Sequence, residues 1–60
     1  MDIYIATVQT LEKQYKITMN FSGDLTFVDS YVRICDTAGD ILFIPKYDVK
    51  AITITKKGDV

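Results

Sequence analysis

Apolar and polar residues alternate most regularly between residues 15 and 22. The odd positions of this segment (YKITMNFS) are apolar and the even positions are polar. A period of two sustained over eight residues is typical of a β-strand that has one face on a core and the other in water. The Ser22-Gly23-Asp24 sequence that follows predicts a turn.

Five further segments have strand composition and are separated by turn-forming residues. The predicted strands are residues 3–10, 25–28, 31–36, 41–44 and 49–55. Asp29-Ser30 predicts a turn or a bulge, and residues 36–40 predict a hairpin loop in which Gly39 takes a positive φ. Another turn is expected near Glu12-Lys13.

The expected faces of three of these strands follow from the same alternation. Val32 and Ile34 should lie on one face of their strand, while Tyr31, Arg33 and Cys35 share the other. In residues 49–55 the two isoleucines, at 52 and 54, should point inward and the two threonines outward. The run Ile41-Leu42-Phe43-Ile44 has no alternation, which predicts a strand covered on both faces, by the core and by a partner or another segment.

Two segments allow more than one interpretation. Residues 3–8 carry apolar groups on both faces of a predicted strand, and a short helix over Thr10 to Tyr15 is the alternative to the turn beside them. Residues 56–60 are expected to form a frayed tail.

The chain is therefore expected to be one all-β domain, residues 1–60, with five to six short antiparallel strands in meander order. A meander this small can curl into a barrel or pair with a second copy. Over the second half of the chain, the order of strand, Gly-Asp turn, apolar run, Pro45, short connection and closing strand is similar to the end of SH3-like and Sm-like small barrels. This resemblance favours a barrel over an open sheet, although the helix that precedes the Sm-like barrel has no counterpart.

Composition supports strands and predicts association. Ile, Val and Thr make up 20 of the 60 residues, whereas Ala, Leu and Glu make up 7, and β-branched side chains favour pleated sheets over helices. A domain of this length buries only about 60% of its unfolded surface. Cys35 is the only cysteine and histidine is absent, so neither an internal disulfide nor a zinc site can stabilise the fold.

Because 48% of the residues are hydrophobic, we expect some of them to be covered by another chain, either a second copy or a different protein. The expected interface comprises Ile3, Tyr4, Ile5, Ile41, Leu42, Phe43 and Ile44. Self-association should complete the fold.

The residue types present argue against an enzyme. Without histidine, no Ser-His-Asp or Cys-His arrangement can form. Ser22 and Ser30 are interpreted as turn residues, and Cys35 as a strand residue with a redox-sensitive contact as its alternative. Asp36 and Asp40 flank one loop, where ordinary turn chemistry is favoured over a Ca²⁺ site. We expect no catalytic residue, no cofactor and no metal.

Charge is distributed unevenly along the chain. Residues 24–40 hold four aspartates and one arginine, a net −3, while residues 46–57 hold four lysines and one aspartate, a net +3. The lysines of residues 46–57 are interpreted as charges that keep the protein soluble and discourage unwanted pairing at a sheet edge. The alternative is that they attract an acidic partner. Aromatic and basic groups also indicate an alternative, a nucleic-acid-binding barrel that uses Tyr31, Arg33, Lys46, Tyr47 and Lys50.

The expected function is non-catalytic binding of another protein by a self-associating β module. Small acidic β proteins of this size are similar to inhibitors encoded by phages and other mobile elements, which indicates an inhibitor or adaptor. Besides the nucleic-acid alternative, a small-molecule-sequestering oligomer with pockets between subunits stays open. The N-terminus lacks a basic region, no segment has the roughly 20 apolar residues of a membrane span, and the net charge is −1. With one unpaired thiol, a cytoplasmic location is expected.

Overall fold

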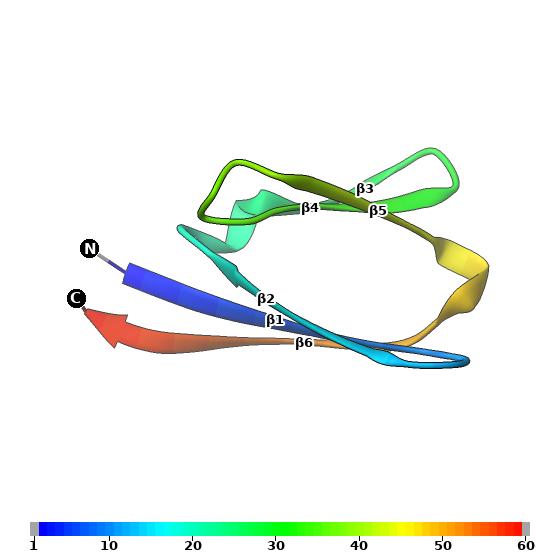
Figure 1. Cartoon of the computed structure of the whole chain (residues 1–60), viewed down its shortest axis with the longest axis horizontal. Coiled ribbons are helices and arrows are strands. Elements are labelled where there is room, and N and C mark those ends of the chain that lie inside the picture. Colours follow the sequence, from blue (N-terminus) through cyan, green and yellow to red (C-terminus); the bar gives the residue numbers. More distant parts are fainter. Residues whose placement is uncertain (1, 60) are drawn as a thin grey trace.

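The computed structural model describes residues 2–59, which form two three-stranded antiparallel sheets stacked as two layers (Figure 1). The lower sheet in that view contains β1 (Asp2–Thr10), β2 (Gln14–Met19) and β6 (Val49–Asp59). The upper sheet contains β3 (Leu25–Val28), β4 (Tyr31–Cys35) and β5 (Ile41–Pro45). Single 3₁₀ turns, η1 (Ser22–Asp24) and η2 (Lys46–Asp48), carry the chain from β2 to β3 and from β5 to β6. The all-β expectation is confirmed.

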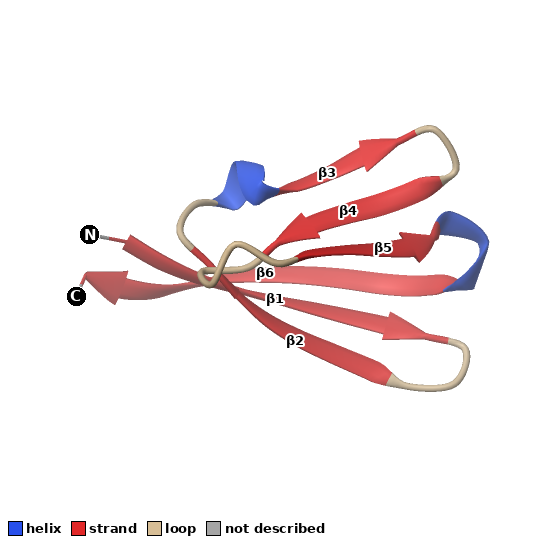
Figure 2. Cartoon of the chain, turned by 45° about the horizontal axis from the view of Figure 1, so that its top comes forward, coloured by secondary structure: helices blue, strands red, loops and turns tan. Residues whose placement is uncertain are grey.

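The meander order is only partly correct. The upper sheet is a meander, β3-β4-β5, but the lower sheet has the order β2-β1-β6, so the first strand pairs with the last (Figure 2). Among the described strands, the two sheets do not close into a barrel by strand pairing. β5 ends at Pro45, which has no N–H to offer to a further strand, and Lys46 still donates its N–H to the carbonyl oxygen of Ser30 at 2.8 Å as η2 begins.

β1 is the central strand of the lower sheet. Both of its edges are hydrogen-bonded, to β2 and to β6. On its inner face Ala6 lies between Ile17 and Ile54, and Val8 lies between Tyr15 and Ile52. The helix considered for residues 10–15 does not form, since β2 begins at Gln14.

Among the described residues, six hydrophobic side chains form the buried core, three from each layer. They are Ala6, Val8 and Met19 from the lower sheet and Val32, Ile34 and Ile44 from the upper sheet. Val32 and Ile34 are on the inward face, as the alternation predicted. Ile54 lies on the inward face as predicted, opposite Ala6, but 39% of its surface is exposed.

The run Ile41 to Ile44 divides between the two faces of β5. Ile44 is buried and Leu42 packs against the core, whereas Ile41 and Phe43 are exposed on the opposite face. The prediction that one face meets the core is therefore confirmed. The other face is open in the single chain.

The loop between β4 and β5 is held by its own first residue. Oδ1 of Asp36 accepts hydrogen bonds from the backbone N–H groups of Ala38 and Asp40, at 2.9 and 3.0 Å. Gly39 has φ = 91°, as predicted for this position. Asp29, in the turn between β3 and β4, has φ = 53°, a conformation that aspartate tolerates better than most residues.

The expected tail at residues 56–60 is wrong for the described part of that segment. β6 continues to Asp59, with Lys56 paired to Tyr4 and Gly58 to Ile3 across an irregularity in the register. Pairing with the long first strand supplies backbone partners that a free tail would lack. Residue 60 lies outside the described residues.

Candidate functional site

The outer face of the upper sheet carries the largest group of exposed apolar side chains that share one sheet. Alternation along β4 places Tyr31, Arg33 and Cys35 on the side away from the core. On β5, Ile41 lies opposite Cys35 and Phe43 lies opposite Arg33. Val28, the last residue of β3, pairs with Tyr31. We define the upper face as Val28, Tyr31, Arg33, Cys35, Ile41 and Phe43.

Four of these side chains are substantially open to solvent. The exposed fractions are 41% for Val28, 45% for Tyr31, 48% for Ile41 and 53% for Phe43. The rings of Tyr31 and Phe43 meet edge to face, with centroids 6.1 Å apart and planes at 83°. Arg33, half-buried, contributes the only charge of the upper face. A contiguous apolar patch with a single cation is typical of an interaction surface.

Only part of the interface predicted from sequence lies on this face. Ile41 and Phe43 belong to it, whereas Leu42 and Ile44 point into the interior. The predicted residues near the N-terminus are on the other sheet, where Tyr4 packs against the core and Ile3 and Ile5 are half-buried. The two segments thus do not combine into one surface.

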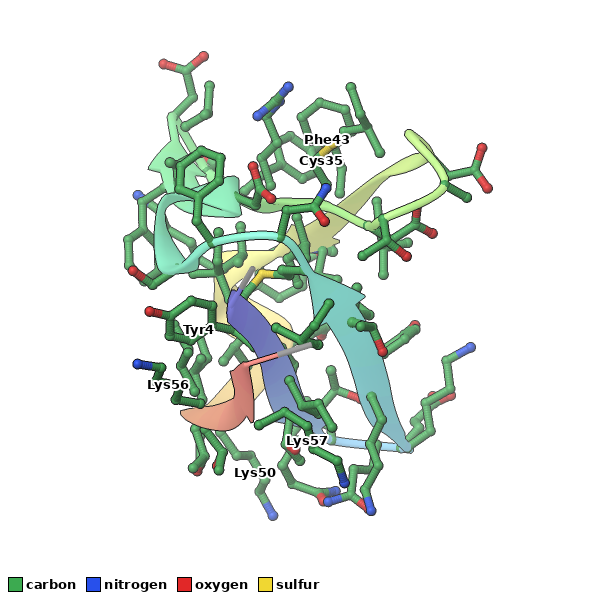
Figure 3. The ribbon with its side chains drawn as sticks, turned by 90° about the vertical axis from the view of Figure 1, so that its left-hand side faces the viewer. Tyr4, Cys35, Phe43, Lys50, Lys56 and Lys57 are labelled. Atoms are coloured by element: carbon green, nitrogen blue, oxygen red, sulfur yellow. The ribbon has the colours of Figure 1, made fainter. Side chains whose placement is uncertain are left out.

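The residues proposed for nucleic acid also separate. Tyr31 and Arg33 share the upper face, but Lys46 places its ammonium 5.6 Å from the ring centre of Phe27. Tyr47, in η2, is 81% exposed. Figure 3 shows Lys50 on the far side of the lower sheet, with Phe43 and Cys35 above the upper sheet. One flat ligand therefore cannot contact all five residues at once.

A pocket of about 200 Å³ lies beside the upper face, where the turn between β1 and β2 approaches the end of β5 and η2. Its lining comprises Thr10, Leu11, Glu12, Lys13, Tyr15, Phe43, Ile44, Pro45 and Asp48. The backbone N–H of Leu11 donates to the carbonyl oxygen of Asp48, at 3.1 Å, and ties the two sides together. The sequence did not predict this pocket, since its walls come from segments far apart in the chain.

The turn beside the pocket is fixed by Thr10, the only polar residue of the buried set in the described chain. Its hydroxyl donates to the carbonyl oxygen of Lys13 at 2.8 Å and accepts from the Lys13 N–H at 3.1 Å. The Lys13 ammonium lies 4.8 Å from the ring centre of Tyr15. Polar and aromatic groups of the pocket are thus held in place by short-range contacts.

Cys35 and Asp36 are the residues for which the sequence left a reactive or metal-binding alternative open. Cys35 is a free, half-buried thiol that donates to the carbonyl oxygen of Asp36 at 3.7 Å. Within residues 2–59 no three metal-ligating side chains cluster. The Asp36 carboxylate accepts hydrogen bonds from two backbone N–H groups of its own loop, as an aspartate in a turn commonly does. No helix in this part of the chain has the length and apolar character to cross a membrane.

Comparison with protein-family models, with curated protein sequences and with solved structures gives no match to this chain. A fold class alone does not determine a function, so the chain's own surfaces carry the information about its function.

Proposed function

We propose that the chain is a non-catalytic β module that binds proteins through the upper face and associates with a second copy through the same surface. The observation that carries this proposal is the continuous exposure of Val28, Tyr31, Ile41 and Phe43 on one sheet face. Aromatic residues and arginine are enriched at protein interfaces, and Tyr31, Phe43 and Arg33 supply both types.

The size of the upper face indicates a weak contact. A fully buried aromatic side chain covers about 150–250 Å², so the four half-exposed side chains offer roughly 350 Å² of further burial in each copy. Two such faces remove roughly 700 Å², which is below the 1,200–2,000 Å² or so of stable complexes. Self-association in the micromolar range or weaker leaves the face available to another protein.

The surface of a single copy is otherwise ordinary. Its accessible area is 4045 Å², close to the roughly 4,000 Å² that a compact monomer of this mass exposes. The total exposed area is therefore normal, and what favours a partner is the placement of the apolar side chains on one sheet face.

Sedimentation velocity and affinity capture test the proposal. We expect the wild type to shift from monomer toward dimer between about 10 µM and 1 mM, the range of weak interfaces. Tyr31→Asp should abolish the shift and the capture of partners from a host lysate, because it puts a carboxylate on the apolar face. Tyr47→Asp is the matched control, since Tyr47 is 81% exposed and lies in η2. A monomer across the whole range, or equal behaviour of the two variants, contradicts self-association through this face.

We further propose that the two sheets are the halves of a small barrel of SH3-like kind, acting in the cytoplasm. The strand orders β6-β1-β2 and β3-β4-β5 and the 3₁₀ turn between β5 and β6 support the barrel. The free thiol of Cys35 supports a reducing compartment.

A second candidate function is binding of single-stranded nucleic acid on the upper face. Tyr31, Arg33 and Phe43 together resemble the aromatic and basic groups on which bases stack. Filter binding at roughly 50 mM salt separates this candidate from the first, because phosphate contacts weaken steeply with salt. No binding at low salt, or binding unaffected by Arg33→Ala, removes it.

A further inference from the structure

We infer that the pocket between the β1–β2 turn and η2 receives an arginine side chain of the bound protein. This inference deepens the proposed function, on which it rests, by naming the chemistry of the partner. The pocket is continuous with the upper face because Phe43 belongs to both. A protein lying on the upper face therefore has a side-chain pocket within reach.

The size of the pocket favours one side chain over a small molecule. Its volume is about 200 Å³, whereas sites for drug-sized ligands have about 300–1,000 Å³. The turn and η2 are already joined by the hydrogen bond from Leu11 to Asp48. That link is a backbone contact, so it is independent of which side chains line the pocket.

The charge of the lining favours a cation. Glu12 and Asp48 contribute carboxylates, and Lys13 is the one basic residue among the lining side chains. The Lys13 ammonium lies over the ring of Tyr15, at 4.8 Å from its centre, within the range of a cation–π contact. The aromatic wall thus already holds a positive charge from the chain itself.

The aromatic walls distinguish arginine from a generic cation. A guanidinium is planar, stacks on aromatic rings and donates to carboxylates in a fixed fork. Tyr15 and Phe43 are the aromatic residues of the lining, and Glu12 and Asp48 are its two acidic residues. An entering arginine competes with Lys13 for the Tyr15 ring, so removing this lysine should strengthen binding.

The probe is N-acetyl-arginine N-methylamide, titrated into the ¹⁵N-labelled full chain and followed by amide chemical shifts. We expect saturable shifts at Leu11, Glu12 and Asp48 with a dissociation constant in the millimolar range. The citrulline analogue, which has the same shape without the charge, should leave these amides in place. Equal shifts with citrulline, or no saturable shift up to about 50 mM probe, overturn the inference.

Three substitutions and one control sharpen the test. Glu12→Gln and Asp48→Asn should each weaken probe binding about two- to fivefold, as expected for exposed ion pairs. Lys13→Gln should strengthen it about two- to fivefold, by vacating the Tyr15 ring and removing a like charge. Lys50→Gln removes the same charge from the far side of the lower sheet and should have little effect (Figure 3). Equal effects of the two lysine substitutions contradict the inference.

The two proposals can fail separately. Tyr31 does not line the pocket, so Tyr31→Asp should leave probe binding unchanged while it abolishes association. Loss of probe binding in a wild type that still associates overturns the pocket inference alone. Retained probe binding in a chain that stays monomeric and captures no partner overturns the proposed function alone.

Discussion

Two isoleucines on one strand provide the most direct measurement of which face of β5 is buried. Ile44 is 3% exposed and belongs to the core, whereas Ile41 is 48% exposed on the upper face. Ile44→Ala and Ile41→Ala are chemically the same substitution. Their difference in stability therefore reports the environment of each side chain.

The magnitudes follow from the number of carbons removed and from their exposure. Each substitution deletes three carbons, worth about 0.8 kcal/mol apiece when fully buried. At Ile44 this gives about 2.4 kcal/mol, and the cavity that remains brings the expected loss to about 2–5 kcal/mol. At Ile41 roughly half of that surface is already in water, so about 1 kcal/mol is expected and solvent fills the space.

Urea unfolding followed by circular dichroism measures both values in the monomer, at low micromolar concentration. A chain of this length has a free energy of unfolding of about 3–9 kcal/mol, so Ile44→Ala should lose a large part of it. Ile44→Val, expected to lose about 0.5–1.5 kcal/mol, keeps the comparison with Ile41→Val measurable if the alanine variant does not fold. Equal losses at the two positions refute the assignment of opposite faces.

Three further substitutions test the loops. Thr10→Val keeps the shape of the side chain and removes both side-chain hydrogen bonds to Lys13, while the Thr10 backbone N–H still donates to the Lys13 carbonyl oxygen; we expect a loss of about 0.5–1.5 kcal/mol in urea unfolding, and an unchanged free energy of unfolding contradicts the role of this hydroxyl. Asp36→Ala removes the acceptor of two backbone N–H groups and should lose about 0.5–2 kcal/mol, with faster hydrogen exchange at Ala38 and Asp40. Gly39→Ala should destabilise by about 1 kcal/mol, because φ is 91° there; a stabilised variant in thermal unfolding contradicts this conformation.

Alternation predicted the parts of the fold in which a strand has one buried and one open face. Val32 and Ile34 are buried and Tyr31 is exposed, as their spacing indicates. Turn chemistry was equally informative at Gly39, where the need for a positive φ is local to the chain. The face of a strand residue and the conformation of a turn both depend on residues nearby in the sequence, so one sequence is enough to predict them.

Pairing between distant segments could not be predicted in the same way. Nothing in residues 3–10 identifies residues 49–59 as their partner, because either strand could pair with any segment of similar pattern. Phe27 shows the same limit for burial, since its parity matches Val32 but 62% of its surface is exposed near the sheet edge. The pocket was missed because it forms only after Leu11 and Asp48 meet.

The pairing of β1 with β6 has a consequence for how the chain acquires its fold during synthesis. Ala6 pairs with Ile54, near the opposite end of the sequence, so a large loop must close before this contact forms. At about 5–20 residues per second, the segment between these strands takes several seconds to make. Throughout that interval β1 has one unpaired edge of backbone donors and acceptors, which other chains can join. A chaperone that shields extended segments during synthesis should therefore raise the yield of this protein.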